Sequence, residues 1–285
     1  MRTLLDIPYA EAGVGHHGTP GRRTLRMDAY LPEGTDGPVP AVVLAFGGAF
    51  HRGSKENDSF PTAGSYGPNT SMAEYCRRFA EEGLACFSID YRLAGDDPDP
   101  GTTPVLTRPA SVPMGRIEQV RVIMGLPPVD ALWMAGVMEA AYDDMAAAGR
   151  AVTARAAEFG VDPKRIVLGG WSAGARAALY AAHAEGVPCA GVIALSGLMQ
   201  PEDVAAHMAP GKAHPPVLLL AADEDLPSTR DWAKPMADAM RERGCAVRHL
   251  TVLGRDHWYA AEAMTDAGVT VQQAMRQALR DWTGA

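Results

Sequence analysis

The sequence contains few cysteines, and they fall in none of the patterns that give cysteine a structural or metal-binding role. Its 285 residues include four cysteines, whose spacing fits neither a disulfide framework nor a zinc site. The sequence also lacks an H-E-x-x-H motif and any comparable cluster of metal-ligating residues. We therefore expect no bound metal, and we expect the thiols to stay reduced in a cytoplasmic environment.

Excess positive charge and long apolar runs are also missing. Acidic residues outnumber basic residues by 34 to 26, a formal net charge of −8, whereas nucleic acids and anionic membranes favour basic patches. No apolar run approaches the roughly 18 residues of a membrane span. Asp6 and Pro8 interrupt the amino-terminal segment where a signal-peptide core would lie. The sequence thus predicts a cytoplasmic protein without nucleic-acid or membrane partners.

Two segments match nucleotide-binding motifs only in part. Residues 13–18 fit the spacing G-x-G-x-x-G, but we expect neither the strand before them nor the helix after them that dinucleotide binding requires. The segment PGKAHPP contains a lysine after a glycine but lacks the other residues of a phosphate loop. We therefore expect no cofactor.

Buried strands alternating with helices are what the sequence does contain. Continuous apolar runs, typical of strands buried on both faces, occupy residues 41–48, 84–93, 166–168, 189–197, 215–225 and 246–254. An exposed strand is expected over residues 22–32, and helices over residues 71–83, 130–159, 175–184 and 270–282. This alternation predicts the α/β class, with a mostly parallel central sheet and helices on both faces.

A serine with glycines on either side lies where one strand meets a helix. Residues 170–174 read Gly-Trp-Ser-Ala-Gly and fit the pattern G-x-S-x-G. A nucleophile on so tight a turn occupies strained backbone, and a Cβ two positions before or after it would clash, so Gly170 and Gly174 fit these positions. Ser172 is the candidate nucleophile. The alternative is an ordinary strand-to-helix turn with a capping serine.

A serine nucleophile needs a histidine base and a carboxylate that orients the base. After this motif the histidine comes last in the chain, which leaves His249 and His257. His249 lies within an expected strand, whereas His257 follows that strand in the loop GRDHW. We therefore expect His257 to be the base, with the role of a structural loop histidine as the alternative.

The carboxylate is expected directly after the strand that ends in VLLLAA. Asp223, Glu224 and Asp225 are the candidates. Asp225 lies in the bend before Leu226, where a side chain can clear the strand end and turn back toward His257. We therefore favour Asp225, with Asp223 as the alternative.

Several further segments are similar to one known family. The chain resembles an α/β-hydrolase of the esterase/lipase type, close to bacterial carboxylesterases with an HGG-type oxyanion loop. The segments that carry the resemblance extend over most of the chain and read VVLAFGGAFHRGS, DYRLAG, AAEFGVDPKRIVLGGWSAGA, LLLAADEDLPS and GRDHW. The resemblance implies one α/β-hydrolase domain over residues 1–285, and it places the family's aspartate on Asp225.

The glycine-rich loop after the strand at residues 41–48 departs from the family pattern. Phe46 stands where the family has histidine, and Ala49 replaces the third glycine. Because an oxyanion hole uses backbone N–H groups, these replacements are compatible with one. The resemblance implies Gly48 or Ala49 as one donor and Ala173 as the other, whereas the alternative is a plain glycine turn.

Residues 95–138 form an insertion that the resemblance predicts to be a helical cap over the site. Its methionine-bearing part, residues 113–138, suits a pliable apolar pocket, or else packs on the sheet as core. We expect Met124 and Trp133, together with Phe50 and Trp171, to bind substrate.

The function predicted is hydrolysis of carboxylic esters through Ser172, His257 and Asp225, with an acyl-enzyme intermediate and a small-molecule ester as partner. A homo-oligomer is compatible with the sequence. One alternative is an amide hydrolase, because FGGAFHRGS also resembles arylformamidases and G-W-S-x-G occurs in prolyl-oligopeptidase-like peptidases. The other alternative is a catalytically silent binding protein on the same fold.

Overall fold

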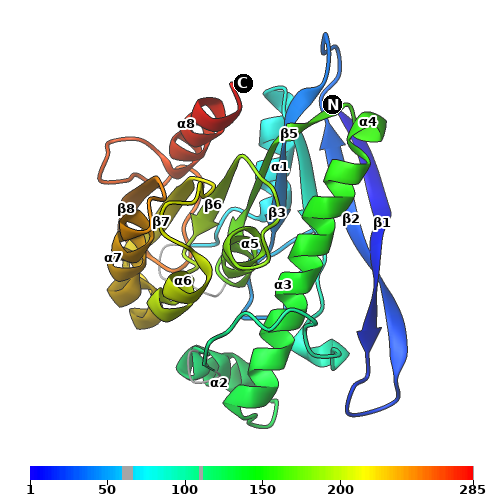
Figure 1. Cartoon of the computed structure of the whole chain (residues 1–285), viewed down its shortest axis with the longest axis vertical. Helices are drawn as coiled ribbons and strands as arrows, with labels where there is room; N and C mark the ends of the chain where they lie inside the picture. The colour runs from blue at the N-terminus through cyan, green and yellow to red at the C-terminus, as the bar shows by residue number, and fades with distance from the viewer. Residues whose placement is uncertain (60–66, 109–111, 285) are drawn as a thin grey trace.

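A single eight-stranded sheet organises the chain in the computed structural model, which describes residues 1–59, 67–108 and 112–284 (Figure 1). Its strands are β1 (Arg2–Val14), β2 (Gly21–Leu31), β3 (Val39–Ala45), β4 (Ala85–Ile89), β5 (Val161–Trp171), β6 (Gly191–Leu195), β7 (Val217–Glu224) and β8 (Val247–Asp256). Their order is β1-β2-β4-β3-β5-β6-β7-β8. Strands β3 to β8 pair in parallel, whereas β1 and β2 are antiparallel to their neighbours. The predicted α/β class is confirmed.

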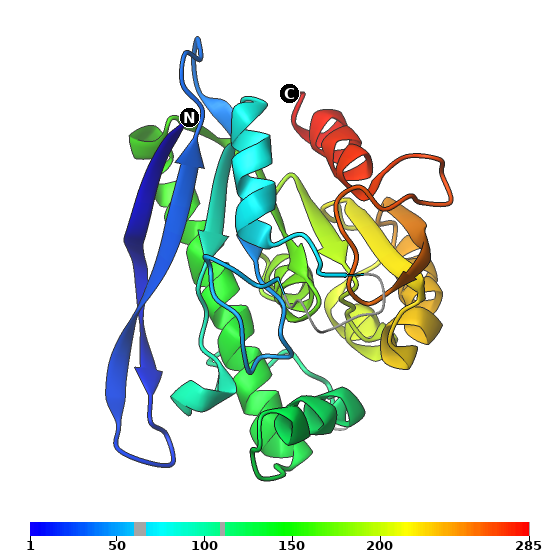
Figure 2. The same ribbon diagram turned by 180° about the vertical axis from the view of Figure 1, so that it is seen from behind.

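Helices cover both faces of the sheet. They are α1 (Met72–Glu81), α2 (Met114–Ile123), α3 (Ala131–Ala154), α4 (Ala156–Phe159), α5 (Ala173–His183), α6 (Pro201–His207), α7 (Pro227–Glu242) and α8 (Val271–Thr283), with a 3₁₀ turn η1 (Ala94–Asp96). Helices α3 and α5 lie on the face turned toward the viewer in Figure 1, and Figure 2 brings α1 and α8 forward on the opposite face. The strands between them are therefore buried on both sides, as β3, β4 and β6 show.

The expected helices form with the ends that their sequences favour. The Ser71 side chain accepts a hydrogen bond from the Glu74 N–H at the start of α1, and the Asp130 side chain caps α3 in the same way. The helix expected over residues 130–159 is α3 followed by the short α4, and it ends at Gly160 with a φ of 67°.

Strand β1 was not expected from the sequence. Its pairing with β2 is interrupted twice, between Leu4 and Ile7 and between Pro8 and Ala10, and most of its residues are exposed or half-buried. Irregular pairing and exposure remove the alternation of apolar and polar residues from which a strand is predicted. The expectation that no strand precedes residues 13–18 is therefore wrong. These residues begin a hairpin into β2, so a strand and not a helix follows them.

Strand β2 is also less exposed than expected. Its first residues are exposed, but Met27 to Leu31 are buried. The reason is that β2 is not an edge strand, because β1 pairs with one side of it and β4 with the other.

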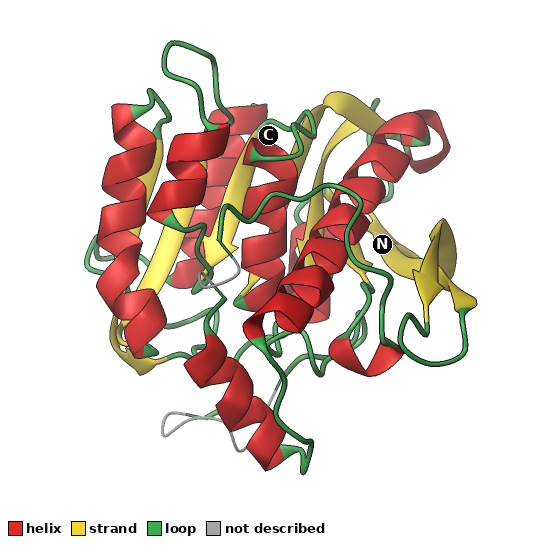
Figure 3. Cartoon of the chain, turned by 60° about the horizontal axis from the view of Figure 1, so that its bottom comes forward, coloured by secondary structure: helices red, strands yellow, loops and turns green. Residues whose placement is uncertain are grey.

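The carboxyl ends of the parallel strands meet at the lower end of the molecule in Figure 1, where α2 also lies. Figure 3 brings this end forward and shows α2 projecting beyond the sheet. Both chain termini lie at the opposite end. The helix α2 belongs to the expected cap insertion of residues 95–138, of which residues 109–111 lie outside the described part of the chain.

Candidate active site

Ser172 lies on the tight turn between β5 and α5. Its φ of 54° and ψ of −112° are strained values for a residue other than glycine. A Cβ on Gly170 would lie 2.4 Å from the Ala45 carbonyl oxygen, and a Cβ on Gly174 would lie 2.0 Å from the same atom. Both glycines are therefore required for β3, β5 and α5 to approach each other closely enough to form the turn.

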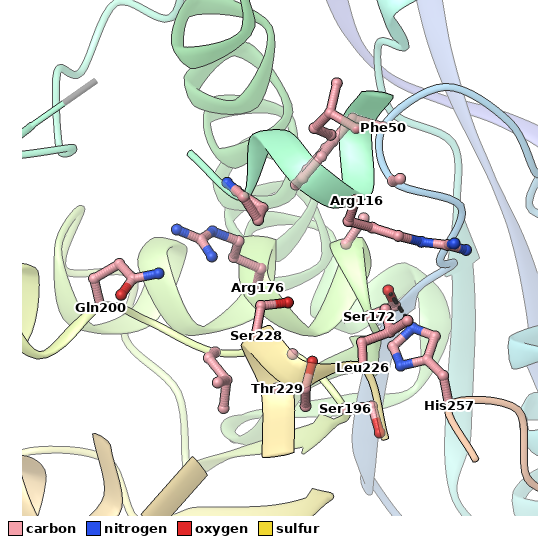
Figure 4. A pocket seen from close by; sticks show the side chains of 16 residues that line it. Phe50, Arg116, Ser172, Arg176, Ser196, Gln200, Leu226, Ser228, Thr229 and His257 are labelled. Carbon is pink, nitrogen blue, oxygen red and sulfur yellow. Dashed lines mark hydrogen bonds between the residues drawn. The ribbon is translucent and has the colours of Figure 1, made fainter. Parts of the chain in front are cut away.

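Ser172, His257 and Asp225 form a continuous chain of hydrogen bonds. Ser172 Oγ lies 2.9 Å from His257 Nε2, and His257 Nδ1 lies 2.6 Å from Asp225 Oδ1. Because the Asp225 carboxylate can only accept, it holds the proton of His257 on Nδ1 and leaves Nε2 free to accept from the serine. Figure 4 shows Ser172 and His257 facing one another at one side of the pocket.

Asp225 is held in place by further donors. Its Oδ2 accepts from Ser196 Oγ at 2.5 Å and from the Ala222 N–H at 3.0 Å, and its Oδ1 accepts from the Leu226 N–H at 2.8 Å. Burial raises the pKa of Asp225. The charge and hydrogen bond of His257, together with the donors Ser196 and Ala222, outweigh this effect, so the net shift of the pKa is downward. Asp225 is therefore a stable anion at neutral pH.

Asp223, the alternative acid, lies elsewhere. Its two carboxylate oxygens accept from the Gly254 and Arg255 N–H groups at 2.8 and 3.1 Å. Asp223 is exposed, whereas Asp225 is buried. Asp223 therefore holds the end of β8 and makes no described contact with His257.

Two tryptophans enclose the His257 ring. The ring centroid of His257 lies 5.1 Å from that of Trp171 and 5.2 Å from that of Trp258. Trp171 Nε1 also donates to the His257 carbonyl at 3.2 Å. Trp171, expected to bind substrate, is buried and absent from the described lining of the pocket. Its contacts fix the backbone and ring of the histidine.

The loop after β3 has an unusual backbone. Gly48, Ala49 and Phe50 all have positive φ, at 114°, 56° and 62°. Among the described residues, no hydrogen-bond acceptor is found for the N–H of Ala49 or of Ala173, and both residues line the pocket that contains Ser172. Gly48 is absent from the described lining, and a Cβ there would lie 2.0 Å from the Arg52 carbonyl oxygen. The lining of the pocket thus favours Ala49 over Gly48 as the candidate first donor of an oxyanion hole.

His51 and Arg121, which the sequence did not single out, support this loop. His51 Nδ1 lies 2.7 Å from the Ala49 carbonyl oxygen, and Arg121 Nη1 lies 3.0 Å from His51 Nε2. Burial, and to a lesser extent Arg121, lower the pKa of His51. The neutral ring can then donate from Nδ1 and accept at Nε2. These contacts connect helix α2 to the loop.

Asp58 supports the same loop from the other side. Its carboxylate accepts from the Gly47 N–H at 3.0 Å and from the Met72 N–H at 2.9 Å. Burial raises the pKa of Asp58 to about 6, despite these donors. A single aspartate in a loop gives no sequence signal for such a role, because its partners are backbone groups of other segments.

The pocket at Ser172 has a volume of about 60 Å³. Its described lining comes from the loop after β3, from α2 and α5, and from the segments that follow β6, β7 and β8. It consists of Ala49, Phe50, Pro113, Arg116, Ile117, Ser172, Ala173, Arg176, Ser196, Gly197, Leu198, Gln200, Leu226, Ser228, Thr229 and His257. Phe50, which the sequence predicts to bind substrate, is among these residues.

Met124 and Trp133 do not lie in this described lining. Met124 is 40% exposed, and Trp133 lines a separate cavity with residues such as Pro100 and Glu139. The expectation that they line the pocket is therefore wrong. The residues of the insertion that do line it are Pro113, Arg116 and Ile117, which lie seven or more positions before Met124, because α2 and not α3 covers Ser172.

The chain is similar to known hydrolases in sequence and structure. Residues 138–228 match the Phospholipase/Carboxylesterase family, and residues 27–103 match the BD-FAE family. Among curated protein sequences, none matches this chain. Within the described residues, no helix has the length and apolar character to span a membrane.

Solved structures of one esterase are among those similar to this chain. Esterase 2 of Thermogutta terrifontis, phosphoramylated by tabun, has a TM-score of 0.60 and 18% identity, over 96% of this chain and 92% of that one. The native form of this thermophilic esterase has a TM-score of 0.59 and 18% identity, over 95% and 90%. The butyrate-bound form has a TM-score of 0.58 and 18% identity, over 90% and 87%. The chain therefore has the α/β-hydrolase fold.

Proposed function

We propose that this protein is a serine hydrolase that cleaves carboxylic esters. The observation that carries the proposal is the chain of hydrogen bonds from Ser172 Oγ through His257 to Asp225, with distances of 2.9 and 2.6 Å. The partial match to the Phospholipase/Carboxylesterase family and the fold shared with an esterase support the same reaction class.

The first half of the reaction forms an acyl-enzyme. Ser172 Oγ attacks the ester carbonyl carbon while His257 Nε2 takes the hydroxyl proton. The Ala49 and Ala173 N–H groups stabilise the negative charge on the carbonyl oxygen. His257 then gives the proton to the leaving alcohol, and Asp225 stabilises the charged imidazole throughout.

The second half repeats these steps with water. His257 removes a proton from a water molecule, whose oxygen attacks the acyl carbon, and Ser172 leaves with the proton. The enzyme returns to its starting state and the carboxylic acid is released. The strained Ser172 backbone stays in place because β5 and α5 fix it on both sides.

The size of the pocket favours short acyl groups. A volume of about 60 Å³ holds roughly four to six atoms of the size of a water molecule. The Thermogutta esterase, of the same fold, has been solved with butyrate and with propionate bound, and both are short carboxylic acids.

The proposal is tested by turnover of aryl esters of graded acyl length, from acetate to octanoate, with acetanilide and formanilide as amide counterparts. We expect hydrolysis of the short esters, its loss in Ser172→Ala, and much slower cleavage of the amides. Faster cleavage of the amides would make the protein an amide hydrolase instead. Failure of every substrate, together with no labelling of Ser172 by a fluorophosphonate, would make it a catalytically silent member of the fold.

A further inference from the structure

Arg176 lies one helical turn after the proposed nucleophile. Ser172 precedes the first residue of α5, and the Arg176 N–H donates to the Ser172 carbonyl at 3.0 Å. Residues four apart share one face of a helix, and both residues line the same pocket. Figure 4 shows Arg176 and Gln200 toward one end of this lining, and Ser172 and His257 toward the other.

The Arg176 side chain is buried without a salt-bridge partner among the described residues. The residue is 6% exposed. Its Nε donates to Tyr142 Oη at 2.8 Å, and its guanidinium lies 5.5 Å from the Tyr180 ring centroid. Its Nη2 is buried without a hydrogen-bond partner, and within the described residues Arg176 forms no salt bridge. Two guanidinium nitrogens are therefore left without a described protein acceptor.

Asp203 does not neutralise this charge through direct contact. Its Oδ1 accepts from the N–H and hydroxyl of Thr107 at 2.7 and 2.6 Å, and its Oδ2 accepts from the Tyr180 hydroxyl. No described hydrogen bond connects Asp203 to Arg176. Asp203 therefore acts on the guanidinium through its charge alone and leaves Arg176 Nη2 without a hydrogen-bond partner.

The pocket carries positive charge and no described negative charge. Its lining includes Arg176 and Arg116 but, among the described residues, no aspartate or glutamate. Arg116 is half-buried, with its guanidinium 5.2 Å from the Trp258 ring centroid. Ser228 and Thr229 add hydroxyl groups to the same lining. This distribution suits an anionic group on the bound molecule, and a neutral substrate would leave the buried cation unpaired.

We propose that Arg176 binds a carboxylate of the substrate, so that the esters cleaved here are short esters that carry a free carboxylate. A guanidinium presents parallel donors that match a carboxylate, and its place one helical turn from Ser172 suits an anion a few atoms from the ester carbonyl. This inference rests on the proposed ester hydrolysis and adds the substrate class.

Matched ester pairs test the proposal. Monoethyl succinate, with its carboxylate on the acyl side, is compared with ethyl 4-oxopentanoate, in which a methyl ketone replaces that carboxylate. Acetoxyacetate, with its carboxylate on the alcohol side, is compared with acetoxyacetone. For at least one pair we expect kcat/KM to favour the charged ester by about tenfold or more, and the responding pair shows which side of the ester Arg176 contacts.

Variants show whether Arg176 causes the preference for charged over neutral esters. In Arg176→Met the ratio of charged to neutral kcat/KM should fall by about tenfold or more, mainly through KM. Should that variant not fold, Arg176→Gln retains a donor for Tyr142 and should lower the same ratio. Arg280→Met, which removes an exposed charge on α8, should leave the ratio as it is. An unchanged ratio in a folded Arg176 variant would overturn the inference.

A binding measurement separates this inference from the proposed reaction. Succinate should slow the labelling of wild-type Ser172 by a fluorophosphonate, and Arg176→Gln should be less protected. Hydrolysis of both neutral esters as fast as of their charged partners, with no protection by succinate, would overturn the inference while ester hydrolysis stands. If Ser172 is not labelled and no ester is cleaved, the proposed function fails, and this inference fails with it.

Discussion

Asp223, near the end of β7, and Asp225, just after that strand, differ in what their carboxylates contact. Asp225 lies 2.6 Å from His257 Nδ1, whereas Asp223 accepts from the backbone of Gly254 and Arg255. Asp225→Asn should lower kcat by about 10⁴, because the amide stabilises the wrong tautomer of the histidine. Asp223→Asn is the matched control and should change kcat much less. Steady-state kinetics on a short aryl ester measure both, and the reverse result would move the acid to Asp223.

The glycines of the nucleophile turn lead to a prediction about both stability and activity. Gly174→Ala places a Cβ 2.0 Å from the Ala45 carbonyl oxygen, so the turn must distort. We expect a lower Tm and the loss of most ester hydrolysis. Gly115→Ala, in α2, meets nothing within 4 Å and should raise stability by about 0.5 to 1 kcal/mol, because alanine favours helix. Equal Tm values and activities for the two variants would contradict the packing described for the turn.

At the scale of elements, helix α2 has the position over Ser172 that the sequence analysis predicted for residues near Trp133. Ile117 lines the pocket, whereas Trp133 lines a separate cavity. Ile117→Ala should therefore change the preference among acyl lengths by roughly 1 to 3 kcal/mol of discrimination. Trp133→Ala should leave that preference unchanged while lowering Tm. Initial rates on an acyl-length series give the two preferences, and a thermal melt gives the Tm. A changed preference in the Trp133 variant alone would place Trp133, and not Ile117, at the acyl group.

Asp58 supports the loop after β3, and its burial makes the stability of the protein depend on pH. The pKa of Asp58 is about 6 in the folded protein, above the roughly 3.9 of an unfolded chain. Its contribution to stability is therefore fully present below about pH 4 and is lost as pH rises through 6. The shift corresponds to roughly 2 to 3 kcal/mol.

Asp58→Asn should remove this dependence. The free energy of unfolding of the variant minus that of the wild type should rise by roughly 2 to 3 kcal/mol from pH 4 to pH 7. Urea unfolding at each pH measures this difference. Asp36→Asn, an exposed carboxylate in the turn before β3, is the control. If the difference between the Asp58 variant and the wild type did not change with pH, the carboxylate would not be perturbed as described.

At the scale of the whole molecule, the sequence predicted the features that depend on buried strands. Apolar runs located the parallel strands, whose carboxyl ends a parallel sheet brings together. With the G-x-S-x-G motif and the order of the residues in the chain, this made Ser172, Asp225 and His257 the candidates. Strand β1 was missed because its pairing is bulged and its residues are largely exposed. Arg176, His51 and Asp58 were missed because their contacts come from distant segments.

The part of the insertion that covers the pocket could not be predicted from the sequence, for a related reason. Helix α2 has little separation of polar and apolar residues, so its sequence does not indicate which side is buried. The methionine-bearing segment around Met124 therefore favoured the wrong part of the insertion. Which part of an insertion covers a site depends on how its helices pack. Met124 is 40% exposed, whereas Ile117 is buried.

Covalent labelling of Ser172 tests the central claim most directly. A fluorophosphonate probe is incubated with the wild type, with Ser172→Ala and with His257→Gln, and the modified peptide is identified by mass spectrometry. The account predicts one label per chain on Ser172, no label in Ser172→Ala, and labelling slowed by orders of magnitude in His257→Gln, because the base no longer activates the hydroxyl. An unlabelled Ser172 in the folded wild type, or equal labelling of the His257 variant, would contradict it.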